Sequence, residues 1–436
     1  MYIESIGLID FRTFARASMD FCFRGRTSTA DFPKAKLPNV NVLLGDNGCG
    51  KTSVLRAIAL AGLGPAVRDA GIFPHSLVRR DRTGPKGKAS IDAHLALHPQ
   101  DRSPSRGLTR PLTGPLTRPL TSSLAGESVS PASDIHSNVT VTLKGDIEQL
   151  NHESPNLPAW EGVYGSSSDA FFMVGYGATR RVDRPEDFNL GARSKSSLPR
   201  AQRVMGLFQD SYALIPLGSW LPSYESRNKG RYVQVAHLLN RILAKSDYKF
   251  TGEFDGADYL FEGRGAKIPF QALSDGYRAL IGWVADLLYH VCFTCPDGKK
   301  LVDNCGIAMV DEVDLHLHPA WQMRIVESLA KALPNIQFIF TSHSPLVVGS
   351  LEWMNVIVMR SRRGAVVAER LTESINGLDA DQLLLTDLFG LKTTRSGAKH
   401  KQLKALSVGA RQGDPKAALE LLRAMSKGSE PGRRAA

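Results

Sequence analysis

The residues best suited to chemistry lie in one glycine-rich stretch, GDNGCGKTS, at positions 45–53. Glycines let the backbone turn so that several N–H groups point at one anion, and a following helix N-terminus adds partial positive charge. The spacing fits the pattern G-x-x-x-x-G-K-[ST], although a glycine turn could match it by accident. We expect a phosphate-binding loop made by Gly45, Asp46, Asn47, Gly48, Cys49, Gly50, Lys51, Thr52 and Ser53.

An acidic pair ends the apolar segment GIAMVDE at positions 306–312. A phosphate site needs a carboxylate at the end of a strand to hold Mg²⁺, directly or through water. We expect Thr52 and Asp311 to bind Mg²⁺. We expect Glu312 to orient and deprotonate an attacking water. The plainer alternative is a pair of acids that leave a strand into a turn.

Two weaker signals follow apolar segments. His343, in FIFTSHSP, could hydrogen-bond a terminal phosphate, but in isolation a structural histidine in a loop is the favoured interpretation. Ser274, Asp275 and Gly276 open a predicted helix, where a hydroxyl, a flexible backbone and a helix N-terminus suit an anion. An ordinary helix N-cap is the alternative there.

Two further groups of candidate metal ligands favour structural interpretations. The histidines of DLHLHP, at 314–319, favour a turn before a helix rather than a metal site. CFTC, at 292–295, has no second cysteine pair at zinc spacing, so buried thiols are the preferred interpretation. The five cysteines show no disulfide framework, which favours a reducing cytoplasm.

The patterns around these motifs predict an α/β fold. The phosphate loop follows the alternating segment NVNVLL and precedes the helical pattern VLRAIALAGLG, and later strand and helix patterns alternate. Two long helices are predicted at 201–215 and 319–333. The predicted organisation is an N-terminal lobe at 1–98, a disordered Pro/Ser/Thr-rich insertion at 99–137, a sheet lobe at 138–196, a helical arm at 197–245, a C-terminal lobe at 246–396 and a basic helical or disordered tail at 397–436.

Composition narrows the class of protein. The 436 residues are 42% hydrophobic and carry a formal charge of +11, as expected of a globular protein. No run of 18 apolar residues predicts a membrane span. Residues 391–436 hold 11 Lys/Arg and 3 Asp/Glu, a net +8, so nucleic acid or another acidic partner is a candidate; a solvated, partly disordered end is the alternative.

The order GDNGCGKTS, LSDGYR, MVDEVDLHLHP and FTSHSP resembles the Walker A, signature, Walker B with D-loop, and switch-histidine motifs of ABC-class ATPases. The branch that includes chromosome-maintenance, recombination-repair and OLD-type proteins is the most similar. VGYGATR (174–180) and residues 377–396 resemble small AAA-type ATPases of bacterial defence operons. The resemblance implies an ABC-type nucleotide-binding domain with a mixed sheet.

In this class ATP is held by Walker A of one protomer and capped by the signature of another, which implies a homodimer or a higher homo-oligomer. Carried over, Glu312 and His343 serve catalysis, and Ser274 and Gly276 reach ATP on the facing subunit. The signature reads L-S-D-G-Y rather than the transporter form L-S-G-G-Q. No Q-loop glutamine is assigned; Gln202 and Gln209 are only candidates.

Two functional interpretations remain open. The first is a slow, partner-regulated ATPase in anti-phage defence, whose ATP-dependent dimerisation switches a separate effector such as a nuclease or toxin. The second is a DNA-repair or DNA-processing ATPase that acts on nucleic acid directly. A transporter motor is disfavoured by the signature and by the lack of a membrane segment. We also expect no nuclease domain after residue 396, where little chain remains.

Overall fold

The computed structural model describes residues 1–29, 32–98, 134–153, 160, 163, 172–194, 199–244, 246–256, 258–263, 265–295, 298–362, 364–372, 375, 377–391, 393 and 397–426. The chain divides into two compact units, Met1–Gly377 and Leu378–Ala436. Most of the predicted insertion, residues 99–133, lies outside the described residues. Residues 134–137 instead begin a strand, so the predicted boundary at 137 is wrong.

A six-stranded sheet forms the centre of the first unit. In spatial order it contains β18 (Ala365–Arg370), β17 (Val356–Arg362), β3 (Val40–Gly45), β16 (Ile336–Ser342), β15 (Gly306–Val310) and β9 (Met173–Tyr176). The strands from β17 to β9 run parallel, and β18 is antiparallel. The predicted mixed sheet is therefore confirmed. β15 and β16 are buried along their whole length because elements cover both faces of the sheet.

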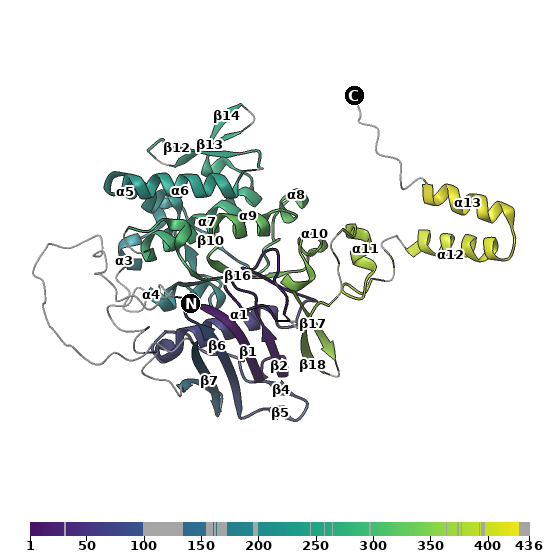
Figure 1. Cartoon of the computed structure of the whole chain (residues 1–436), viewed down its shortest axis with the longest axis horizontal. Coiled ribbons are helices and arrows are strands. Elements are labelled where there is room, and N and C mark those ends of the chain that lie inside the picture. The colour runs from purple at the N-terminus through teal and green to yellow at the C-terminus, as the bar shows by residue number, and fades with distance from the viewer. Residues whose placement is uncertain are drawn as a thin grey trace, which may run out of the picture. The chain divides into compact units, whose positions relative to one another are not determined.

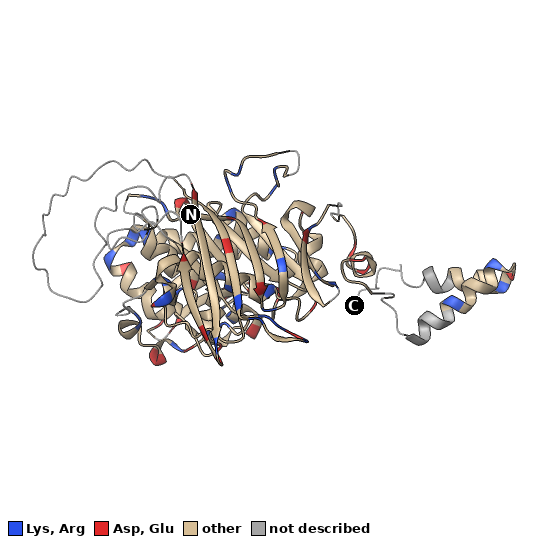
Figure 2. Ribbon diagram, turned by 90° about the horizontal axis from the view of Figure 1, so that it is seen from below, with Lys and Arg blue, Asp and Glu red and all other residues tan. Residues whose placement is uncertain are grey.

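A second, antiparallel sheet packs on the same core. Its spatial order is β2 (Phe14–Asp20), β1 (Tyr2–Phe11), β6 (Lys88–Ala96), β7 (Asp134–Lys144) and β8 (Ile147–Glu153). Helix α1 (Lys51–Leu63) contacts β6 and β7 of this sheet and β3, β9 and β16 of the parallel sheet, so it lies between the two sheets (Figure 1). In Figure 2 the strands of this sheet bear only scattered charged residues.

A helical layer lies against α7 (Asp275–Thr294), which is buried along most of its length. Helices α5 (Leu217–Arg227) and α6 (Lys229–Ile242) contact α7, and α6 also contacts α9 (Ile325–Ala332). A three-stranded sheet, β12 (Lys249–Phe254), β13 (Tyr259–Gly263) and β14 (Ala266–Pro269), follows α6 in the chain (Figure 1).

The long helix predicted at 201–215 is not formed. That range contains the end of α4 (Pro199–Gln202), the 3₁₀ turn η4 (Met205–Leu207) and the short strand β11 (Ala213–Leu214), which pairs with β10 (Arg181–Val182). Tight backbone packing explains the break: a Cβ on Gly177 would lie 2.2 Å from the carbonyl oxygen of Gly206. Contact with the segment after β9 thus overrides the local helical pattern.

The predicted helix at 319–333 is divided in two. It forms α8 (Pro319–Gln322) and α9, with the break at Met323 and Arg324. The other elements of the first unit are short: η1 (Gly64–Arg68), β4 (Arg80–Asp81), β5 (Gly84–Pro85), η3 (Pro185–Asp187), α3 (Leu190–Ser194), η5 (Phe270–Ala272), η6 (Leu301–Asp303), α10 (Pro345–Gly349) and η7 (Trp353–Asn355).

The second unit is helical. It contains α11 (Ala380–Leu385), α12 (Gly397–Arg411) and α13 (Pro415–Ser426), and α12 packs against α13. Among the residues that the structure describes, no helix has both the length and the apolar character needed to cross a membrane.

Candidate active site

The glycines of the 45–53 loop are required by its backbone. Gly48 and Gly50 have φ values of 82° and 81°, in the left-handed region that side chains disfavour. Gly45 ends β3, and a Cβ there would lie 2.5 Å from the carbonyl oxygen of Met359 on β17. Helix α1 begins at Lys51, directly after this loop. The strand–loop–helix context that a phosphate loop needs is therefore present.

Lys51 folds back over its own loop. Its ammonium donates to the carbonyl oxygens of Gly45, at 2.7 Å, and Asp46, at 3.0 Å, and lies 3.4 Å from Nδ1 of His343. Burial lowers the pKa of Lys51, while the carboxylates of Asp311 and Glu312 oppose that change. The cation thus lies inside the loop, next to the histidine that the sequence predicts at a terminal phosphate.

The two residues predicted to serve Mg²⁺ are in contact. The Thr52 hydroxyl donates to one oxygen of Asp311 at 2.6 Å, and the Thr341 hydroxyl donates to the other at 2.5 Å. Asp311 lies at the end of β15, beside the end of β16, so the topology of adjacent parallel strands brings these groups together. A hydroxyl and a buried carboxylate at this spacing are hard oxygen donors that fit Mg²⁺.

Glu312 is held by its backbone. Its φ is 47°, unusual for a residue with a side chain, and its N–H donates to the Thr341 hydroxyl at 2.7 Å. Its carboxylate lies 4.0 Å from Nε2 of His343. The candidate base and the candidate phosphate contact therefore face each other across the end of the parallel sheet.

Arg180 is a site residue that the motif analysis did not identify. It follows β9, the neighbour of β15, and its guanidinium donates to the backbone carbonyl of Glu312 at 2.7 Å. Burial lowers its pKa to about 10, while Asp311, Asp314 and Glu312 oppose the change. Arg180 is the last residue of VGYGATR, the segment whose resemblance could have identified it. Only the fold places Arg180 beside the acidic pair. No described contact joins Gln202 or Gln209 to Asp311, Glu312 or Lys51.

The signature residues occupy a different place. Ser274 is the N-cap of α7, and a Cβ on Gly276 would lie 2.5 Å from the carbonyl oxygen of His316. Asp275 pairs with Arg278. Among the described contacts, no hydrogen bond or ion pair joins Ser274, Asp275 or Gly276 to the phosphate loop.

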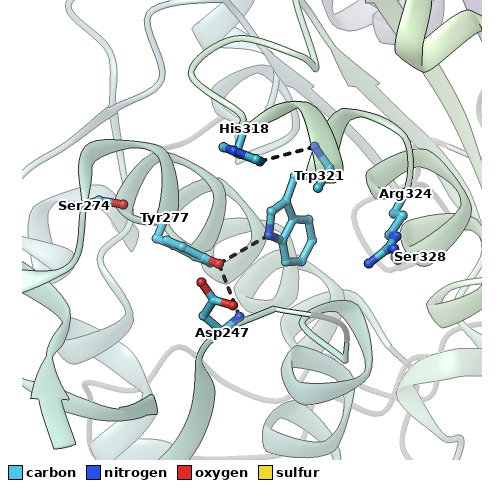
Figure 3. Close-up of a pocket in the computed structure, with 8 residues that line it drawn as sticks. Asp247, Ser274, Tyr277, His318, Trp321, Arg324 and Ser328 are labelled. Atoms are coloured by element: carbon cyan, nitrogen blue, oxygen red, sulfur yellow. Dashed lines mark hydrogen bonds between the residues drawn. The ribbon is translucent and has the colours of Figure 1, made fainter. Parts of the chain in front are cut away.

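A pocket of about 390 Å³ opens beside Ser274 (Figure 3). Tyr277 lines this pocket, and its hydroxyl accepts from the backbone N–H of Asp247 at 3.3 Å and from the indole N–H of Trp321 at 3.4 Å. These contacts fix the start of α7 against the segment around α8 and against the 247 loop. The signature is thus anchored from two sides.

The two histidines of DLHLHP lie in the turn that leads into α8. His316 has a φ of 62°, and the ring of His318 accepts from the N–H of Ala320 as the N-cap of α8. The five cysteines, including Cys292 and Cys295 of CFTC, are all buried and form no disulfide.

Part of the chain matches a known protein family. Residues 176–349 match the family model described as "AAA domain, putative AbiEii toxin, Type IV TA system". Residues 176–349 belong to an AAA-type ATPase domain. The matched range includes the signature, the acidic pair and His343, while the phosphate loop precedes it. The predicted ATPase and the predicted α/β fold with a mixed sheet are confirmed.

Individual proteins are also similar to this chain. Septu protein PtuA of Bacillus mycoides is 26% identical over 90% of this chain and 45% of that protein. The Retron Ec83 probable ATPase of Escherichia coli is 33% identical over 24% of this chain and 19% of its own length. The chain therefore spans less than half the length of these curated relatives. A crystal structure of an SMC head bound to a winged-helix domain of ScpA aligns at 14% identity and a TM-score of 0.48, over 85% of this chain and 98% of that one.

Proposed function

We propose that this protein binds Mg·ATP and hydrolyses it slowly at sites shared between two copies. The observation that supports it most directly is the 2.6 Å contact between Thr52 and Asp311, which joins the phosphate loop to the strand-end carboxylate. Lys51 and the N–H groups of residues 45–53 bind phosphates. Thr52 and Asp311 would hold Mg²⁺, which would supply positive charge to the phosphate oxygens.

The other residues at this sheet edge handle the attacking water. Glu312 accepts a proton from it, and His343, on the opposite side, donates to the terminal phosphate. The left-handed backbone of Glu312 and its two backbone hydrogen bonds, to Thr341 and Arg180, hold the carboxylate in one direction. A positioned base of this kind contributes about 10²- to 10⁴-fold to the rate.

The shared site is supported by the position of the signature. Among the described residues, no hydrogen bond or ion pair joins Ser274 or Gly276 to the phosphate loop of their own chain, which leaves them for a nucleotide on another copy. A two-fold dimer in which each loop meets the other copy's signature encloses two nucleotides. ATP then stabilises the dimer, and loss of the terminal phosphate releases it.

We further propose that the ATP-bound dimer controls a separate effector, a nuclease or toxin, in anti-phage defence. The relatives named Septu and Retron, and the toxin-related description of the family model, support this assignment. The ATP-dependent dimer is the two-state element through which such an effector can be regulated.

The decisive experiment measures ATP turnover and subunit mass together for wild type and Glu312→Gln. We expect slow turnover in wild type, and in the variant loss of turnover with accumulation of an ATP-bound dimer or larger species. Glu225→Gln, an exposed glutamate on α5, is the matched control and should behave as wild type. If both wild type and Glu312→Gln stay monomeric with ATP, the shared-site mechanism is wrong.

Direct action on nucleic acid is the second candidate function. Lys404, Arg411 and Lys416 are exposed on or beside the α12–α13 hairpin, in a segment with net positive charge. Binding of labelled duplex DNA at two salt concentrations tests it. A strongly salt-dependent affinity that is lost when the three cations become glutamine supports this function, and no measurable binding at low salt excludes it.

A further inference from the structure

Three side chains with metal-binding atoms lie together on the antiparallel sheet, away from the nucleotide site. Asp92 and His94 are on β6 and His136 is on β7. The alternate residues of β6, Ala89, Ile91, Ala93 and Leu95, belong to the core cluster that contains the residues of α1. Because successive side chains of a strand point to opposite faces, Asp92 and His94 project from the face opposite α1.

The strand register brings the three groups together. His94 is directly opposite His136, and Asp92 is two residues earlier on the same face as His94. Nε2 of His136 lies 2.9 Å from Oδ1 of Asp92, and Nε2 of His94 lies 3.9 Å from the same oxygen. The three ligand atoms all lie within 4.8 Å of one another.

We propose that Asp92, His94 and His136 form a binding site for a first-row divalent transition metal, with Zn²⁺ as the ion that fits best. Ligands bound to tetrahedral zinc at about 2.1 Å are separated by about 3.4 Å. The 2.9 and 3.9 Å separations lie on either side of that value, so small side-chain rotations suffice. Two imidazoles and one carboxylate favour such an ion over Mg²⁺ or Ca²⁺, which prefer oxygen donors alone.

The surroundings of Asp92 favour metal binding. The side-chain amide of Asn138 donates to the second carboxylate oxygen of Asp92 at 3.3 Å, which orients the first toward the histidines. On the other side, β1 has Gly7 opposite Asp92, so no side chain from that position fills the space beside the carboxylate. That space is available to a water that completes four-coordination.

An ion here connects two strands that are far apart in sequence. Asp92 and His136 are separated by 44 positions, and residues 97–133 connect β6 to β7. Coordination would add a link between β6 and β7 beyond the hydrogen bonds of the strand pair. Because the ion binds the paired strands and not the unfolded chain, we expect it to raise the melting temperature.

Zinc titration of the full-length, chelator-treated protein tests the site, with bound zinc measured by equilibrium dialysis. We expect wild type to bind one more Zn²⁺ per chain than His94→Ala and Asp92→Asn, or to bind it at least about tenfold more tightly. His94 suits substitution because its side chain is 54% exposed. His75→Ala, which removes an exposed histidine outside the cluster, is the control and should bind as wild type.

Two further readouts separate a metal site from a surface hydrogen bond. Added Zn²⁺ should raise the melting temperature of wild type and of His75→Ala, but not of His94→Ala. Bound Co²⁺ should give visible absorption in wild type that His94→Ala lacks. Equal zinc stoichiometry and affinity in wild type, His94→Ala and Asp92→Asn would overturn the proposal. ATP turnover is not part of the test, so its outcome is independent of the proposed function.

Discussion

The guanidinium of Arg180 donates to the backbone carbonyl of Glu312 at 2.7 Å. This contact joins the loop after β9 to the turn that carries the candidate base. It holds the main chain and leaves the carboxylate of Glu312 for water. We infer that Arg180 is a positioning residue whose loss changes the direction of Glu312 rather than nucleotide affinity.

Replacement of Arg180 should therefore reduce turnover more than binding. For Arg180→Ala we expect kcat for ATP hydrolysis to fall about ten- to a hundredfold, with the Kd for ATP little changed. Arg180→Lys should recover part of the rate, because it keeps the charge and one donor. Steady-state kinetics and nucleotide titration check this. Arg181→Ala, at the exposed neighbour, is the control, and equal losses in both variants would contradict the positioning role.

Removing the Thr52 hydroxyl should weaken Mg²⁺-dependent binding. Thr52 donates to Asp311, and Thr52→Val keeps the shape while it removes the oxygen. We expect the Mg²⁺ concentration for half-maximal turnover to rise at least about tenfold in Thr52→Val and much less in Thr52→Ser. Turnover measured against Mg²⁺ concentration shows this. Identical curves for the two variants would exclude Thr52 as a metal ligand.

A side chain at position 276 should affect ATP-dependent dimer formation but not ATP binding by the phosphate loop. Because a Cβ there would lie 2.5 Å from the carbonyl oxygen of His316, Gly276→Ala must displace the start of α7. We expect ATP binding to be retained and ATP-dependent dimer formation to be lost, as measured by light scattering with the Glu312→Gln background. Gly87→Ala, where a Cβ meets nothing within 4 Å, is the control. Unchanged dimerisation in Gly276→Ala would contradict the role of the signature.

Acid should destabilise the antiparallel sheet through His152. Burial, with a contribution from Arg68, lowers the pKa of His152 to about 4, and its ring lies against Ser137 and Trp160. The unfolded chain, with a pKa near its ordinary value of 6.5, binds a proton more readily than the folded one. This stability is therefore present above pH 6.5 and is lost as the pH falls toward 4.

Chemical denaturation across that pH range measures the effect. We expect the free energy of unfolding of wild type to decrease from pH 6.5 to 4 more steeply than that of His152→Gln, which has no titrating ring. His75→Gln should keep the wild-type slope because His75 is exposed. Parallel slopes in wild type and His152→Gln would show that His152 does not contribute.

Local sequence patterns predict the candidate phosphate loop, the acidic pair and most strands of the parallel sheet. These signals are local: glycine spacing reports backbone conformations that only glycine adopts easily, and buried strands read as apolar runs. Gly48 and Gly50 have the left-handed backbone that the motif implies, and β15 and β16 lie where the apolar segments predict them.

Which of these residues come into contact depends on long-range packing. Thr52 and Asp311 are 259 positions apart, and Arg180 and Glu312 are 132 apart, so no local pattern reports either contact. The helix predicted at 201–215 does not form, because the long-range packing of Gly206 against Gly177 outweighs the local helical periodicity. His94 and His136 likewise become neighbours only through the register of β6 and β7, which is set by long-range strand pairing.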